Sequence, residues 1–258
     1  PTEVNYRANV FGLKLLHCKW VIAVSAVGSL QEEIGMGNLI LIDQFIDKTK
    51  HRKDSFFGDG IVAHAPFSEP CCKTLRDYLS KACKKVQSQR DLVVHESGTY
   101  VNMEGPAFST VAESNLHRSW GGSVIGMTAV AEAKLCREAE ISYAVLAMAT
   151  DYDCWKADGH VTVDIVIKTL KENVIKGQEV IKACVPLIAN HQGPHPQDNG
   201  EDGAMAGAIM TSPAIMPRDR AIALWPLIGK YFNLDDIQGS STESSNPIVS
   251  NEIGAFLA

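Results

Sequence analysis

The sequence has no surplus of positive charge: 24 Lys and Arg residues stand against 30 Asp and Glu residues, giving a formal net charge of −6. Nucleic acids and anionic membranes are bound through a basic face, so this balance argues against both partners. The sequence also lacks any stretch near the roughly 20 apolar residues that a membrane-spanning helix needs. Small molecules are therefore the expected partners.

Two further features are missing. The opening residues, PTEVNYRANV, lack the basic and apolar regions of a signal peptide. The seven cysteines are odd in number, include the adjacent pair Cys71 and Cys72, and contain no C-x-x-C spacing. A disulfide framework and a structural zinc site are therefore not expected. These features favour a soluble protein of the reducing cytoplasm, without a metal site.

Strand-like and helix-like segments alternate along the chain. The 258 residues, 45% of them hydrophobic, can bury a full core as one large domain or two. Hydrophobic spacing predicts strands at 20–30, 38–47, 91–103, 123–128 and 141–150, and helices at 4–18, 69–86, 109–120, 129–140 and 163–184. Such alternation predicts an α/β fold with a mainly parallel central sheet. Beyond residue 190 only 221–232 has the character of a packed segment.

Small and polar residues follow three of the predicted strands at the point where each ends. They are Ser25, Ala26, Val27 and Gly28; Met127 and Thr128; and Thr150, Asp151 and Asp153. Open α/β sheets bind ligands beyond the carboxyl ends of their strands. Asp151 and Asp153, two positions apart in an extended chain, point to the same side. The sequence therefore predicts one composite polar site.

Six blocks of sequence carry a family resemblance. They are VNYRAN, GSLQEEI, IDQFIDKT, GTYVNMEGPAFST, AESNLHRSWGGSVIGMT and AMATDYDCWK. In this order they resemble the 5′-methylthioadenosine phosphorylases of the trimeric purine nucleoside phosphorylase family, from residue 1 to about 186. The resemblance implies a nucleoside phosphorylase-like mixed central sheet flanked by helices. It divides the chain into a phosphorylase domain, 1–190, incomplete at its N-terminus, and a divergent tail, 191–258, without an assigned function.

The resemblance also implies an activity. It is phosphorolysis of 5′-methylthioadenosine to adenine and 5-methylthioribose 1-phosphate, in purine and methionine salvage, by a homotrimeric pentosyltransferase of the cytoplasm and also of the nucleus. Inorganic phosphate is a co-substrate, and no cofactor is implied. Because phosphate is the nucleophile, no protein nucleophile is needed, and we expect Cys154 to be a packing residue.

The two aspartates receive roles as readers of adenine. The family acid at Asp151 faces the purine and helps to protonate ring nitrogen N7, while 6-oxopurine enzymes have asparagine there. Asp153 supports recognition of the exocyclic amino group, directly or through water. If Asp151 transfers a proton, its pKa should be raised by burial and by the negative charge of Asp153.

The remaining site residues carry over position by position. Ser25 and Thr128 match hydroxyls that hold phosphate, and Met127 matches the residue beneath the ribose. Base and ribose contacts are implied for Ala26, Val27, Gly28, Phe108, Ser109 and Thr150. Val163, Val166 and Ile167 match the apolar pocket for the 5′-methylthio group, with His64 reaching it from a neighbouring subunit. For Val163, Ile167 and His64 the alternative is an ordinary structural role.

The sequence departs from the family at several points. The family's first strand, glycine-rich phosphate loop and Arg-His pair have no counterpart, since neither G-G-x-G nor R-H-G occurs. We therefore expect an incomplete sheet with an exposed edge. Three single residues also differ from the family pattern. The family has arginine at the positions of Ala107 and Val111, and proline at the position of Ala131. Two alternatives stay open: a purine nucleoside phosphorylase of other specificity, and an inactive purine-binding or subunit-interaction protein.

Overall fold

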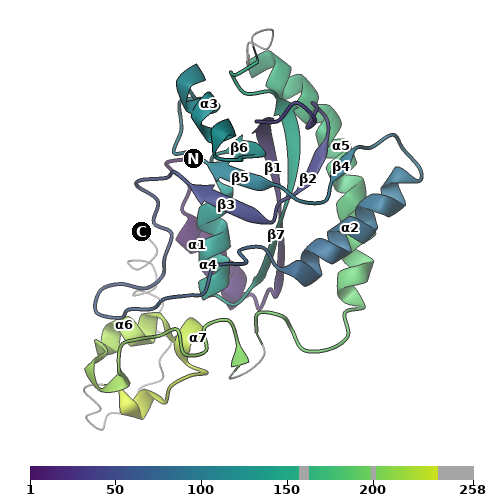
Figure 1. Ribbon diagram of the computed structural model, residues 1–258. Coiled ribbons are helices and arrows are strands. Elements are labelled where there is room, and N and C mark those ends of the chain that lie inside the picture. Colours follow the sequence, from purple (N-terminus) through teal and green to yellow (C-terminus); the bar gives the residue numbers. More distant parts are fainter. Residues whose placement is uncertain (157–162, 199–201, 238–258) are drawn as a thin grey trace.

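A seven-stranded sheet forms the centre of the computed structural model, which describes residues 1–156, 163–198 and 202–237 (Figure 1). The strand order is β3-β5-β6-β1-β7-β2-β4. The strands are β1 (Trp20–Ser29), β2 (Leu39–Leu41), β3 (Gln44–Asp47), β4 (Val94–His95), β5 (Thr99–Asn102), β6 (Val124–Gly126) and β7 (Ser142–Asp151). Neighbours are parallel except for β1 with β6 and β2 with β7. The predicted α/β fold with a mixed, mainly parallel sheet is confirmed.

Helices cover both faces of the sheet. They are α1 (Tyr6–Leu15), α2 (Lys73–Gln87), α3 (Val111–Ser119), α4 (Ala129–Glu138), α5 (Val163–Ala189), α6 (Arg218–Ala223) and α7 (Trp225–Ile228), with short 3-10 helices at Pro213–Ile215 and Leu234–Asp236. Helix α1 packs on α4, and α2 packs on α5. Figure 1 shows these two pairs on opposite sides of β7. The predicted helices are all present.

Two predicted strands are each divided in two. Residues 38–47 form β2 and β3, and residues 91–103 form β4 and β5, so that each half pairs in parallel with the corresponding half of the other segment. The break is fixed at Asp43, whose Oδ1 accepts a hydrogen bond from the Gly98 N–H at 3.0 Å. The Asp43 N–H in turn donates to the Gly98 carbonyl at 3.2 Å. Because the halves lie at opposite ends of the strand order, these links draw the two ends together and curl the sheet.

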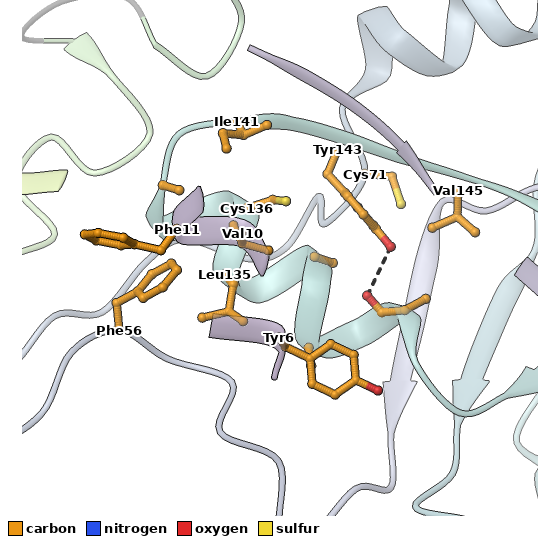
Figure 2. Packing of buried hydrophobic residues seen from close by; sticks show 14 of the residues in the cluster. Tyr6, Val10, Phe11, Phe56, Cys71, Leu135, Cys136, Ile141, Tyr143 and Val145 are labelled. Atoms are coloured by element: carbon orange, nitrogen blue, oxygen red, sulfur yellow. Dashed lines mark hydrogen bonds between the residues drawn. The ribbon is translucent and has the colours of Figure 1, made fainter. Parts of the chain in front are cut away.

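The main core lies between the sheet and the α1–α4 pair. Strand β7 is buried along its whole length. Helix α1 contributes Phe11, which packs on Phe56 with ring centroids 5.8 Å apart (Figure 2). Tyr143 of β7 directs its hydroxyl toward the start of α4, where it lies 3.3 Å from the Ala129 carbonyl oxygen and 2.8 Å from Glu132 Oε2. This packing holds α4 against β7.

The described part of the tail shares this core. Residues buried in the same cluster include Met216, Ala221, Leu224, Leu227, Ile228 and Ile237. The expectation that only 221–232 packs is wrong, because Met205, Met216 and Ile237 are also buried. These residues are far apart in the sequence, at positions 205, 216 and 237, so they form no periodic pattern. A domain boundary at residue 190 stays a prediction.

Strand β1 has an open edge. It pairs with β7 from Trp20 to Gly28, but with β6 only at Gly28 and Ser29. Between Trp20 and Val27 no other described strand occupies the β6 side, and Val24 is 46% exposed. The expected exposed edge is therefore confirmed within the described residues. Among the helices that the structure describes, none is both long and apolar enough to cross a bilayer.

Candidate active site

A pocket of about 340 Å³ lies beside the last residues of β1, β6 and β7. Its lining includes ten predicted site residues: Ser25, Ala26, Val27, Gly28, Phe108, Met127, Thr128, Thr150, Asp151 and Asp153. Sequence reasoning missed four others: Val24, Met103, Ile125 and Gly126. Three of these four are apolar and read as core in the sequence. The strand-end residues thus lie together, while their roles toward a ligand stay predictions.

The two aspartates are buried and held in fixed orientations at the end of β7. Asp151 is 9% exposed and Asp153 is 5% exposed. The Thr150 hydroxyl donates to Asp151 Oδ2 at 2.7 Å, and the Asp153 N–H donates to Asp151 Oδ1 at 2.8 Å. Asp153 has a φ of 50°, in the left-handed region, which turns the chain directly after the strand. Both carboxyl groups therefore remain at the pocket.

Burial raises the pKa of both aspartates, because the charged form loses its hydration. For Asp151, the Thr150 hydroxyl and the Asp153 N–H oppose this rise. For Asp153, the Ser114 hydroxyl opposes it, while the negative charge of Asp151 adds to it. The expected rise in the pKa of Asp151 is present. Its expected second cause is wrong, since Asp153 acts on Asp151 through a donated hydrogen bond that lowers the pKa.

One oxygen of the pair has no hydrogen-bond donor in the described structure. Asp153 Oδ2 is buried and accepts no hydrogen bond from any group that the structure describes. A buried, unpaired carboxylate oxygen is costly, and a donor such as an amino group would satisfy it. Gly28 packs closely against the pair, because a Cβ there would lie 3.0 Å from Asp151 Oδ1. A larger residue at position 28 would therefore displace the Asp151 carboxyl group.

The start of α4 forms the opposite, anion-attracting part of the pocket. Thr128 is the N-cap residue of α4, yet its side chain makes no capping hydrogen bond. Asn102 of β5 supplies the cap instead, since its Oδ1 accepts from the Val130 N–H at 3.0 Å. The Thr128 hydroxyl is thereby left for other partners. The positive end of the helix dipole at this position favours a bound anion.

The backbone carbonyl of Met127 is hydrogen-bonded by an arginine that was not among the predicted site residues. Arg52 donates to the Met127 carbonyl at 3.2 Å and to the Glu104 carbonyl at 2.6 Å. Its guanidinium also pairs with Glu104 Oε1 at 3.1 Å, and only 4% of its side chain is exposed. In the sequence, HRKD reads as an exposed charged stretch. No local signal indicates that Arg52 fixes the loop before α4.

The family model described as "Phosphorylase superfamily" matches residues 1–186. The chain belongs to this superfamily. An S-methyl-5′-thioadenosine phosphorylase of Synechocystis is 48% identical over 233 residues, which cover 90% of this chain and 70% of that protein. The enzyme of the same name from Thermosynechococcus vestitus is 47% identical, with 90% and 78% covered.

Solved structures of the superfamily match the fold as well. A methylthioadenosine phosphorylase from Schistosoma mansoni, crystallised with adenine, superposes with a TM-score of 0.71 at 38% identity. The match covers 74% of this chain and 73% of that one. A mutant adenosine/methylthioadenosine phosphorylase from the same organism, in complex with methylthioadenosine, has a TM-score of 0.70 at 38% identity and covers 74% and 72%. The nucleoside phosphorylase-like fold is thereby confirmed.

Some predicted site residues lie away from the pocket, and one that lines it is largely exposed. Phe108 is a lining residue and is 59% exposed. Ser109 does not line the pocket; its carbonyl accepts a hydrogen bond from the Cys154 thiol at 3.2 Å. Ile167 is 46% exposed and lies outside the lining, and His64 is exposed on a loop where its N–H donates to the Ala208 carbonyl. The side chains of Val163 and Val166 lie outside the described part of the structure.

The pocket suits a neutral, flat ligand at one end and an oxyanion at the other. The described residues contain no group of three or more His, Cys, Asp and Glu side chains arranged to hold a metal ion. At the β7 end stand two buried carboxyl groups with raised pKa values. At the α4 end stand the hydroxyls of Ser25 and Thr128 and a helix N-terminus. This arrangement can hold a base and a phosphate on either side of a sugar.

Proposed function

We propose that this chain catalyses the phosphorolysis of 5′-methylthioadenosine to adenine and 5-methylthioribose 1-phosphate. The observation that carries the proposal is one pocket with the Asp151–Asp153 pair at one end and the Ser25 and Thr128 hydroxyls at the other. The relatives named S-methyl-5′-thioadenosine phosphorylase, at up to 48% identity, support it. So do neighbours crystallised with adenine and with methylthioadenosine.

At the base end, Asp151 serves as the acid. Breaking the N-glycosidic bond leaves negative charge on adenine, and a carboxyl group that keeps its proton can share it with ring nitrogen N7. Burial, by raising the pKa of Asp151, favours that protonated form. The unpaired Asp153 Oδ2 accepts a hydrogen bond from the 6-amino group. The pair thus selects adenine over a 6-oxopurine, which has no such donor.

At the anion end, phosphate lies against the first turn of α4. Ser25 and Thr128 donate hydroxyl protons to its oxygens, and the helix N-terminus stabilises its charge. The sugar lies between the two ends, above Met127, whose backbone is fixed by Arg52. As the bond to adenine breaks, positive charge develops on the ribosyl group, and the nearby phosphate anion both stabilises it and attacks it. No protein nucleophile and no cofactor takes part.

The finer parts of the proposal concern assembly and location. We assign the 5′-methylthio group to an apolar wall of Val163, Val166 and Ile167, completed by His64 of a neighbouring subunit in a homotrimer. The exposed position of His64 is compatible with a contact between subunits. We place the protein in the cytoplasm, and also in the nucleus.

One alternative has a specific observation in its favour. Among the residues that line the pocket in the described structure, no lysine, arginine or histidine is present. Phosphate would then be held by hydroxyls and a helix end without a full counter-charge. A purine-binding protein that does not turn over would have this character.

Adenine release from 5′-methylthioadenosine, with and without inorganic phosphate, tests the proposal. We expect release that requires phosphate, and inosine to be cleaved much more slowly. Cys154→Ser is the matched control, because a hydroxyl can keep the hydrogen bond to the Ser109 carbonyl and no cysteine chemistry is needed. Adenine binding without turnover would establish the inactive alternative, and faster cleavage of inosine would establish the other specificity.

A further inference from the structure

A buried phenol lies directly behind the two hydroxyls assigned to phosphate. Tyr100 of β5 is fully buried and does not line the pocket. Its hydroxyl oxygen is 3.2 Å from Ser25 Oγ. Burial raises the pKa of this phenol, and the Ser25 hydroxyl and the N–H and side chain of Thr128 oppose that rise. The Tyr100 oxygen therefore lies beside two pocket residues, Ser25 of β1 and Thr128 at the start of α4.

The backbone around Tyr100 leaves its hydroxyl no other position. A Cβ at Gly126 would lie 1.9 Å from the Tyr100 oxygen and 2.5 Å from Cζ, so the phenol occupies the space that a side chain there would need. On its other side the ring packs on Phe45, with centroids 5.6 Å apart. Because the ring is confined between Gly126 and Phe45, the position of its hydroxyl is set by the fold.

The number of protons that each hydroxyl can donate limits how Tyr100 can act. A serine or threonine hydroxyl has one proton and two acceptor sites. To donate that proton to phosphate, each hydroxyl must be free of other acceptors and should be oriented by a donor from behind. Tyr100 has one proton to donate, and the hydroxyl within hydrogen-bonding distance of it is that of Ser25, at 3.2 Å. Donation from Tyr100 to Ser25 Oγ would direct the serine proton into the pocket.

We infer that Tyr100 is a positioning residue for phosphate, acting through Ser25 rather than by touching the ligand. The inference rests on the proposed function, in which the Ser25 and Thr128 hydroxyls bind phosphate. It assigns to Tyr100 a role beyond core packing, and it explains why position 126 is glycine. Adenine binding, which takes place at the Asp151 end of the pocket, is independent of Tyr100.

Tyr100→Phe removes the hydroxyl alone, and Tyr143→Phe is a matched control. Tyr143 is also buried, and its hydroxyl binds Glu132 rather than Ser25 or Thr128. We expect Tyr100→Phe to raise the KM for phosphate about five- to tenfold, which corresponds to the loss of one hydrogen bond. The KM for methylthioadenosine should be unchanged. Tyr143→Phe should change neither constant.

A double-mutant cycle with Ser25→Ala separates positioning from packing. If Tyr100 acts through Ser25, adding Tyr100→Phe to Ser25→Ala should raise the phosphate KM much less than it does in the parent. Additive effects, or an unchanged phosphate KM in Tyr100→Phe, would overturn the inference. If Tyr100→Phe does not fold, Gly126→Ala, which keeps the phenol but displaces its hydroxyl, should weaken phosphate binding in the same way.

Calorimetric titration with inorganic phosphate tests the role of Tyr100 without requiring that the protein cleaves methylthioadenosine. If the parent does not cleave methylthioadenosine, the proposed function fails, and the inference is then decided by the phosphate Kd of the parent against Tyr100→Phe. A raised Kd in Tyr100→Phe alone supports the inference. An equal Kd in both, or no phosphate binding by the parent, overturns it.

Discussion

Asp151→Asn is the substitution that tests the chemistry most directly, because the surroundings of Asp151 can accept an amide. The Asn Oδ1 can still accept the Asp153 N–H, which donates at 2.8 Å in the parent. The Asn Nδ2 can donate to the Thr150 hydroxyl oxygen, and that hydroxyl can donate to the Val27 carbonyl, 3.2 Å away. Both hydrogen bonds are thus kept, and only the one with Thr150 reverses its direction. Because burial raises the pKa of Asp151, its ionised form costs stability, and we expect the free energy of unfolding at neutral pH to rise rather than fall in Asp151→Asn.

The expected effect on activity is large. An amide cannot transfer a proton to N7, and loss of a general acid typically lowers the rate about 10²- to 10⁴-fold. The protonated carboxyl is the active form, so turnover by the parent should fall as pH rises through the raised pKa of Asp151. Asp151→Asn should lose that decline, because the amide does not titrate. Its residual activity should come from positioning and from the phosphate end of the pocket.

The assay is adenine release from methylthioadenosine at saturating phosphate, measured from about pH 5 to pH 8, a range that includes pKa values raised above the usual carboxyl range. Denaturant unfolding of both proteins provides the control for stability. A parent and variant with the same flat pH profile would refute the acid role of Asp151. So would a variant that retains full turnover while remaining folded.

Three further predictions concern other parts of the molecule. Burial raises the pKa of Glu138 from 4.5 to about 7, so its ionised form is disfavoured in the folded state. The free energy of unfolding should therefore fall by about 3 kcal/mol as pH rises from 4.5 through 7. Denaturant titrations of Glu138→Gln should no longer show this fall. Gly28→Ala should raise the Kd for adenine about tenfold, because the added Cβ would lie 3.0 Å from Asp151 Oδ1. Titration calorimetry measures this Kd, and an unchanged value would show that adenine binds elsewhere. Lys230→Met should lower the free energy of unfolding by about 3 kcal/mol, because it removes the cation 2.5 Å from the buried Glu140 carboxylate. An unfolding free energy equal to that of the parent would show that this ion pair does not stabilise the tail.

The strand-end residues could be predicted because their positions follow from local sequence. An apolar run that ends in Thr150 and Asp151 indicates a buried strand with polar atoms at its end, and the fold then brings such ends together. The resemblance supplied their roles. The mixed sheet, by contrast, followed from the resemblance rather than from the alternation of elements, which indicated only a mainly parallel one.

The supporting residues could not be predicted, because their roles exist only in three dimensions. Tyr100 and Asn102 read as ordinary positions of a strand, and Arg52 reads as part of an exposed charged stretch. Each becomes meaningful only when β5 or the loop after β3 is placed behind the start of α4. The isolated apolar residues of the tail were missed for a related reason, since Met205 is buried and Met216 packs in the main core without belonging to a periodic pattern.

The capping of α4 by Asn102 separates two demands that usually fall on one residue. At most helix starts the same side chain must stabilise the helix and present any polar group that faces a ligand. Here the strand residue Asn102 stabilises the helix, and Thr128 is free to serve the ligand. Changes at position 128 can therefore alter anion affinity at little cost in stability, while changes at 102 do the reverse. Over many generations, affinity for the anion and stability of the scaffold can thus be adjusted independently.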